Sequence, residues 1–241
     1  MIEIVAVPAF TDNYIWMMHD DASGETAVID PAIAEPVLEA AAARGWRIGQ
    51  ILNTHWHPDH VGGNLAIKTA TGCSIAGPAA EADRIPGIDV QLSEGDDVRV
   101  GAHVAEIWEV PGHTLGHIAF IFRSLATVFV GDTLFAMGCG RLFEGTAAQM
   151  HKSLLRFAAL PRDTAVYCAH EYTLANARFA ASVDPANRAL GARFDEVAAK
   201  RAAGIITLPS SIGAELDTNP FLRARDAAEF GRLRLAKDSF S

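Results

Sequence analysis

The sequence predicts an α/β (α+β) fold with two sheets and helices outside them, followed by a small helical domain. Short apolar runs rich in Val and Ile recur through the first 130 residues, with few helical segments between them. This pattern is typical of layered α and β architecture. From Thr173 onward Ala, Arg and Glu dominate and β-branched runs become rare. We therefore expect a first domain over 1–172 and a helical domain over 173–241.

The expected strands are short apolar segments bounded by turn residues. In chain order they are Ile2–Val7, Ile15–Met18, Ala27–Ile29, Ile48–Asn53, Val98–Val100, Val104–Val110, Ile118–Phe122, Thr127–Val130 and Ala165–Cys168.

The expected helices begin and end at residues that suit helix termini. Pro36 stands in the first turn of Glu35–Arg44 and Gly45 directly follows it, as helix starts and stops prefer. Thr146 and Gln149 form a capping-box pattern at the start of a later helix, and Pro161 ends it. The remaining expected helices are Asn64–Ala70, Asn176–Ser182, Asn187–Ala203 and Ala224–Lys237.

Composition indicates a globular protein and disfavours one class of partner. Half of the 241 residues are hydrophobic and 20% are charged, which gives ample material for a core. The net charge of -9 argues against a nucleic-acid partner, because such proteins carry basic patches. Residues 1–155 hold 8 Lys and Arg against 19 Asp and Glu, whereas 156–241 hold 12 against 10. The last third could therefore accept a small anionic ligand.

Cysteine usage and the N-terminus favour a cytoplasmic location. Cys73, Cys139 and Cys168 form no C-x-x-C pair, and their odd number argues against a disulfide framework. We expect neither a secretory signal nor a membrane span, because no segment has the required apolar length. Cys139 could be proposed as a nucleophile. We interpret it instead as a small residue in a Gly-flanked loop, where a substrate can approach the backbone.

Four potential metal ligands lie within six residues of the segment Thr54–His60, directly after an expected strand. His55 and His57 are two apart, so in an extended segment both point the same way. Asp59 and His60 follow Pro58, which bends the path. The segment can therefore offer one pair of ligands to one metal ion and a second pair to another.

Three further candidates occupy the same kind of position. His113, Asp132 and His170 each follow the carboxyl end of an expected strand, where sites are often built on a rigid scaffold. Seven ligands are too many for one tetrahedral ion and suit two ions that share a carboxylate. Imidazole and carboxylate suit divalent zinc, iron or manganese. Of these metals, zinc is the one that we expect, with iron or manganese as alternatives. His117 follows the His113 loop and could support a ligand. His19, His103 and His151 are not expected to take part in the site.

Thr54-His55-Trp56-His57-Pro58-Asp59-His60 resembles the H-x-H-x-D-H signature of the metallo-β-lactamase superfamily, which implies an αββα sandwich. That superfamily hosts hydrolases, nucleases and some oxidoreductases. Other stretches are similar to the glyoxalase II (hydroxyacylglutathione hydrolase) family. They are Pro8–Tyr14, Gly131–Phe135, Gly138–Thr146, Cys168–Thr173, Asn219–Arg223 and Lys237-Asp238.

The resemblance implies a role for each matching residue. It implies that His55, His57 and His113 hold the first metal ion, that Asp59, His60 and His170 hold the second, and that Asp132 bridges them. Asp59 and Asp132 would orient a metal-bound hydroxide. Glutathione contacts are implied for Arg141, Phe143, Tyr172, Arg234 and Lys237. Some family members have Lys at the position of Arg141 and Tyr at that of Phe143.

The implied activity is hydrolysis of S-D-lactoylglutathione and related S-2-hydroxyacylglutathiones to D-lactate and glutathione. It would proceed through a metal-bridging hydroxide, as the second step of methylglyoxal detoxification. A competing hypothesis is an iron-dependent glutathione persulfide dioxygenase, whose members lack the C-terminal helical extension. The motifs are also compatible with another hydrolase of the superfamily and with a non-enzymatic binding module. We expect a monomer, because no apolar stripe is left over.

Overall fold

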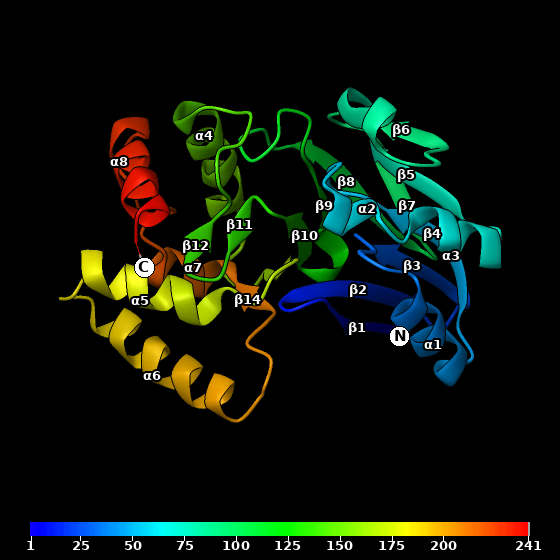
Figure 1. Cartoon of the computed structure of the whole chain (residues 1–241), viewed down its shortest axis with the longest axis horizontal. Helices are drawn as coiled ribbons and strands as arrows, with labels where there is room; N and C mark the ends of the chain where they lie inside the picture. The colour runs from blue at the N-terminus through cyan, green and yellow to red at the C-terminus, as the bar shows by residue number, and fades with distance from the viewer. Residues whose placement is uncertain (241) are drawn as a thin grey trace. The chain divides into compact units, whose positions relative to one another are not determined.

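The computed structural model describes residues 1–240. The chain forms two compact units: a first unit of Met1–Glu109 with Gly116–Gly131, and a second unit of Val110–Leu115 with Asp132–Ser241 (Figure 1). The expected boundary after residue 172 stays a prediction, because the two units are defined by compactness and not by the change in composition on which that boundary rests. None of the helices in residues 1–240 is both long and apolar enough to cross a bilayer.

One sheet of the first unit combines antiparallel and parallel pairing. Its strands run in the order β1 (Ile2–Ala9), β2 (Asn13–Asp20), β3 (Glu25–Ile29), β4 (Arg47–Leu52), β5 (Ser74–Pro78) and β6 (Val90–Leu92). Strands β3 to β6 are parallel. Parallel neighbours need crossover connections, which α1 (Glu35–Arg44), α2 (Pro58–Val61) and α3 (Asn64–Thr71) provide. The carboxyl ends of β3 and β4 therefore lie at one edge of the sheet.

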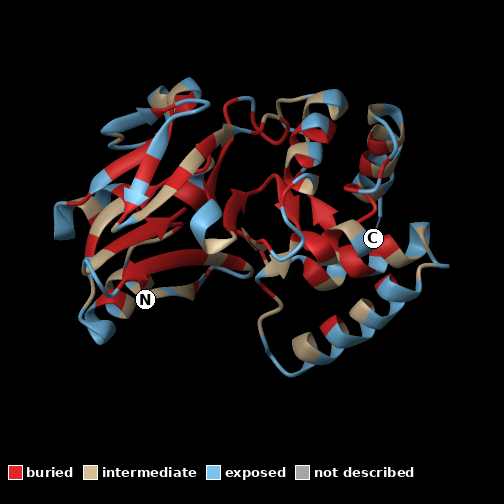
Figure 2. Ribbon diagram, turned by 180° about the vertical axis from the view of Figure 1, so that it is seen from behind, coloured by how far each residue is buried: buried red, intermediate tan, exposed pale blue. Residues whose placement is uncertain are grey.

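Both faces of this sheet are buried. Ile15 and Met17 of β2 share a core cluster with Val37 of α1 and Ile67 of α3, so these helices cover one face. Because side chains alternate along a strand, Met18 points to the other face, and it is buried too. Most of β2 is accordingly red in Figure 2.

The other strands of the first unit form an antiparallel meander. They are β7 (Asp97–Val100), β8 (His103–Glu109), β9 (Ile118–Phe122) and β10 (Thr127–Gly131). Strand β7 contacts β2 and β3, and the backbone N–H of Gly101 donates to Glu25 Oε2 at 2.6 Å. Two sheets with helices outside are thus confirmed.

The second unit is mainly helical. Its helices are α4 (Ala147–Ala158), α5 (Thr173–Val183), α6 (Arg188–Ala202), α7 (Ile212–Thr218) and α8 (Ala227–Asp238). Its strands are the hairpin of β11 (Leu134–Phe135) with β12 (Gly138–Cys139), and β13 (Ala165–Cys168) paired with β14 (Ser210–Ser211). Helices α5 and α6 pack through Ala177, Ala180, Leu190 and Val197. The helical region expected after Thr173 is confirmed.

Most element predictions hold, and the failures share a cause. The expected bounds of α1, β9 and β13 agree with the structure, and the capping box of Thr146 and Gln149 is formed. The sequence patterns missed β5, β6, α2, the β11–β12 hairpin, β14 and α7. Each of these elements is seven residues long or shorter. At this length the hydrophobic period is weak, and only a continuous apolar run, as in β9 and β13, marks the element.

Candidate active site

The ligand segment Asn53–His60 leaves the carboxyl end of β4 and is fixed to the end of β3. The backbone N–H and the hydroxyl of Thr54 donate to Oδ1 and Oδ2 of Asp30, each at 2.7 Å. Asp30 is buried and adopts a φ of 50°, a left-handed conformation that Asp tolerates better than most residues. Both oxygens of the carboxylate are thus used to hold the segment.

The histidines of this segment lie close together. Nε2 of His55 is 3.0 Å from Nδ1 of His57, and the ring of His117 stacks on His55 with 4.6 Å between centroids. His55 is fully buried, whereas His57 is partly exposed. His117 therefore lies where it can support the orientation of His55.

Asp59 and His60 are held by residues from two other strand ends. The Asn13 amide donates to Asp59 Oδ2 at 3.1 Å, and His60 Nε2 lies 3.6 Å from the same oxygen. His60 Nδ1 is 3.1 Å from Asp30 Oδ2. Sequence reasoning missed Asp30, although it directly follows an expected strand, as the predicted ligands do.

Asp132 of the second unit faces two histidines with its two oxygens. Oδ2 lies 3.4 Å from His113 Nε2, and Oδ1 lies 3.4 Å from His170 Nε2. His113 Nδ1 is 2.9 Å from the carbonyl oxygen of Arg141. A bond from Nδ1–H to that carbonyl leaves Nε2 free of its proton and able to bind a metal. All three side chains are buried, and a carboxylate between two ligands is the arrangement that a bridging role requires.

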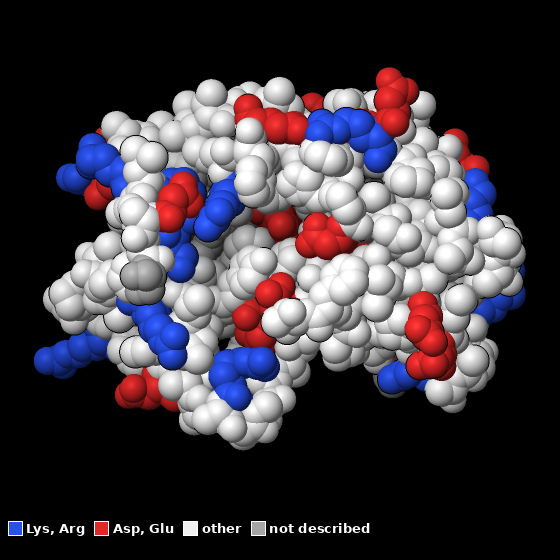
Figure 3. All heavy atoms as spheres, viewed as in Figure 1, with Lys and Arg blue, Asp and Glu red and all other residues white. Residues whose placement is uncertain are grey.

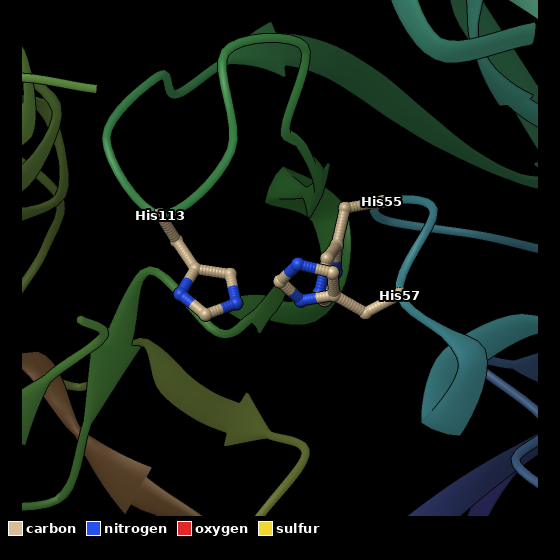
Figure 4. Close-up of side chains that lie close together, drawn as sticks. All are labelled: His55, His57 and His113. Atoms are coloured by element: carbon tan, nitrogen blue, oxygen red, sulfur yellow. The ribbon is translucent and has the colours of Figure 1, made fainter. Parts of the chain in front are cut away.

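The potential ligand atoms form groups of a size that suits metal ions. Within the first unit, the potential ligand atoms of Asp30, His55 and His60 lie within 4.8 Å of one another. Figure 4 draws the side chains of His55 and His57 from the ligand segment, and that of His113 from the loop that follows β8. Imidazole nitrogens and carboxylate oxygens suit zinc, iron or manganese. The donor set thus fits the binuclear metal site that the sequence predicts.

A pocket of about 440 Å³ lies in the second unit beside these ligands. His113 and Asp132 line it, and so do the cations and rings that the sequence predicts to contact glutathione. Those five residues are Arg141, Phe143, Tyr172, Arg234 and Lys237. Figure 3 shows Lys and Arg atoms beside a hollow in this unit. The predicted residues are thus brought to one cavity.

The cations of this pocket differ in how firmly they are held. Arg234 is 5% exposed and donates to the carbonyl oxygen of Cys139 at 2.8 Å and to Asp238 Oδ1 at 2.9 Å. Burial, and then the charges of Arg234 and Arg141, lower the pKa of Lys237. A cluster of three cations with one carboxylate leaves a positive field, which suits an anionic ligand.

The hairpin that carries Cys139 is clamped by buried polar side chains. Glu215 accepts from the N–H of Met137 at 2.8 Å. The Asn219 amide donates to the carbonyl oxygens of Phe135 and Gly138 at 3.1 and 2.9 Å. These contacts fix the wall of the pocket. Sequence reasoning did not find Glu215, which is fully buried on the short helix α7.

Cys139 is not suited to nucleophilic attack. Burial raises the pKa of its thiol to about 11, so the thiolate does not form near neutral pH. This agrees with the interpretation of Cys139 as a small residue in the pocket wall.

Comparisons with known proteins agree with this geometry. The profile of the metallo-β-lactamase superfamily matches residues 12–170, and that of the hydroxyacylglutathione hydrolase C-terminus matches residues 171–240. A hydroxyacylglutathione hydrolase of Methylococcus capsulatus is 55% identical over 98% of this chain and 92% of its own length.

Another relative and a solved structure extend the similarity. A hydroxyacylglutathione hydrolase of Rhodospirillum rubrum is 51% identical, with 99% of both chains covered. The crystal structure of ETHE1 from Myxococcus xanthus superposes with a TM-score of 0.74 at 25% identity, covering 98% of this chain and 90% of that one. The chain belongs to the hydroxyacylglutathione hydrolase, or glyoxalase II, family of the metallo-β-lactamase superfamily.

Proposed function

We propose that this protein hydrolyses S-D-lactoylglutathione and related S-2-hydroxyacylglutathiones to D-lactate and glutathione, the second step of methylglyoxal detoxification. The observation that carries the proposal is the shared pocket, in which His113 and Asp132 lie with Arg141 and Lys237. A thioester carbonyl and the carboxylates of its glutathione part need both kinds of group within one cavity. Relatives of nearly the same length are named for this activity.

The proposed metal ligands form two sets joined by one carboxylate. They are His55, His57 and His113 for one divalent ion, Asp59, His60 and His170 for the other, and Asp132 for both. We propose zinc first, with iron or manganese as the next choices, because the donor types do not separate these ions. When bound, the ions supply Lewis acidity and lower the pKa of coordinated water.

The two carboxylates have defined tasks in this proposal. The amide of Asn13 donates to Asp59 Oδ2 at 3.1 Å, and this contact fixes the direction in which the carboxylate faces. Asp132 faces His113 with one oxygen and His170 with the other. Their fixed positions would orient the attacking water, since small misplacements are costly in catalysis.

The substrate is held by the cations and rings of the pocket. Arg141 and Lys237 would bind glutathione carboxylates through charge-assisted hydrogen bonds. Arg234 is anchored to Cys139 and Asp238, so it contributes a fixed charge. Phe143 and Tyr172 present exposed rings that can pack against the aliphatic part of the peptide.

A glutathione persulfide dioxygenase is less well supported than the thioesterase. The profile of the hydroxyacylglutathione hydrolase C-terminus covers residues 171–240, and this region supplies Tyr172, Arg234 and Lys237 to the pocket. The expectations of a monomer and of a cytoplasmic location stay predictions, which sedimentation and cell fractionation test.

The deciding experiment offers the purified protein two substrates. We expect turnover of S-D-lactoylglutathione with release of one thiol per D-lactate. Glutathione persulfide is offered in parallel in an oxygen-electrode cell. Oxygen uptake with persulfide and no thioester hydrolysis by metal-loaded protein would reject the proposal in favour of the dioxygenase.

A further inference from the structure

A short 3₁₀ helix, η1 (Ala79–Arg84), holds the ligand segment through a buried carboxylate. Glu81 is 3% exposed. Its Oε2 accepts a hydrogen bond from the N–H of Trp56, and its Oε1 accepts one from the N–H of Gly116, both at 2.9 Å. A single side chain therefore joins two segments that lie far apart in the sequence.

Arg84 of the same helix also contacts the ring of Trp56. The guanidinium carbon of Arg84 lies 3.2 Å from the centroid of the indole, within the range of a cation–π interaction. Trp56 is thus held at its backbone by Glu81 and at its ring by Arg84. Such a double hold restricts the rotation of the peptide units on either side of Trp56.

The second partner of Glu81 is a glycine that is packed tightly against it. A Cβ on Gly116 would lie 2.6 Å from Cγ of Glu81 and 2.9 Å from Cβ of Ala80. A larger residue would push Glu81 away from this N–H. The hydrogen bond between Glu81 and Gly116 therefore depends on glycine at position 116.

The two joined positions flank histidines. Trp56 lies between His55 and His57, and Gly116 directly precedes His117, whose ring stacks on His55. The N–H of Ile118 also donates to the carbonyl oxygen of Thr54 at 2.9 Å. The residues on both sides of His55, and its ring, are therefore each held by a contact with the Gly116–Ile118 segment or with Glu81.

We infer that Glu81 is a positioning residue that holds the His55–His57 pair in its metal-binding geometry, with Arg84 as its helper. Glu81 itself is neither a ligand nor a substrate contact in this inference. The inference rests on the proposed metal-binding role of the ligand segment. It goes beyond that role by assigning the geometry of the pair to η1.

The test is the rate of metal release from the full-length protein. Zn²⁺-loaded wild type, Glu81→Gln and Glu81→Asp are mixed with excess chromogenic chelator. Gln at this position offers one acceptor oxygen and turns its NH₂ toward the other N–H. Glu25→Gln is the matched control, because Glu25 accepts from the N–H of Gly101 in the same unit without touching the ligand segment.

We expect Glu81→Gln to release zinc roughly tenfold faster than wild type, as is typical when a residue that supports metal ligands is removed. Glu81→Asp should fall between the two, and Glu25→Gln should match wild type. The Co²⁺-loaded Glu81→Gln variant should show an altered visible spectrum, which reports ligand geometry independently of activity.

Release within twofold of wild type with an unchanged cobalt spectrum would overturn the inference. If the Gln variant is not recovered folded, the Asp variant decides by the same criterion. A wild type that binds no zinc would instead count against the proposed function, so the two failures are distinguishable.

Discussion

Asn13 and Asp59 lie 46 positions apart, yet the amide of Asn13 donates to Asp59 at both its carboxylate and its backbone carbonyl oxygen, at 3.1 and 3.4 Å. The first residue of β2 thereby sets the orientation of a proposed ligand. The contact also explains why a segment at the start of the chain belongs to the site.

Removal of this amide should weaken metal binding. Asn13→Ala is expected to lower the affinity for the metal ion proposed to bind Asp59 by roughly tenfold. At limiting metal, kcat should fall by a similar factor. Metal titration followed by calorimetry measures the effect. Gln50→Ala is the control, because the side-chain amide of Gln50 donates a hydrogen bond to the carbonyl oxygen of Arg99 in the same unit. Equal losses in both variants would mean that the effect is general destabilisation.

Loss of a cation should affect substrate binding more than chemistry. Lys237→Met is expected to raise KM for S-D-lactoylglutathione about tenfold, the cost of one charge-assisted bond, with kcat changed by less than about threefold. Arg232→Met, on the same helix but outside the pocket, should leave KM unchanged. Steady-state kinetics with zinc content measured alongside makes the test. A fall in kcat at unchanged KM would contradict the proposed contact.

The pKa of Lys237 predicts a pH dependence. Burial and the charges of Arg234 and Arg141 lower this pKa, so the ammonium loses its proton at a lower pH than an ordinary lysine. The charged form binds a carboxylate. Affinity for a non-hydrolysable S-alkylglutathione should therefore be full below this pKa and fall as pH rises through it. Lys237→Met should lack this transition, and a transition retained by the variant would assign it to another group.

Cys139 should be dispensable for chemistry. Its thiol pKa of about 11 keeps it protonated near neutral pH, and it is 4% exposed. Iodoacetamide at pH 7.5 should leave the native protein active, and Cys139→Ala should keep kcat within about threefold of wild type. Inactivation that matches alkylation of Cys139 would revive the nucleophile hypothesis.

The sequence predicted the elements with strong local signals. Pro36 and Gly45 mark the ends of α1, and Thr146 with Gln149 caps α4, because each acts on neighbouring backbone groups. The predicted substrate contacts also share one pocket.

The supporting residues could not be found in this way. Glu81, Asp30 and Glu215 act across 24 to 78 positions of the chain. Each of them has a backbone N–H group among its partners, and such a group leaves no mark in the sequence. Such carboxylates become visible only when the fold brings the segments together.

The central claim is that hydrolysis depends on metals held by this ligand set. The most direct measurement follows turnover of S-D-lactoylglutathione before chelation, after chelation and after Zn²⁺ is restored, with metal content determined at each stage. The account predicts about two ions per chain at full activity, loss of turnover with loss of metal, and recovery on reloading. Unchanged turnover by fully demetallated protein would contradict it.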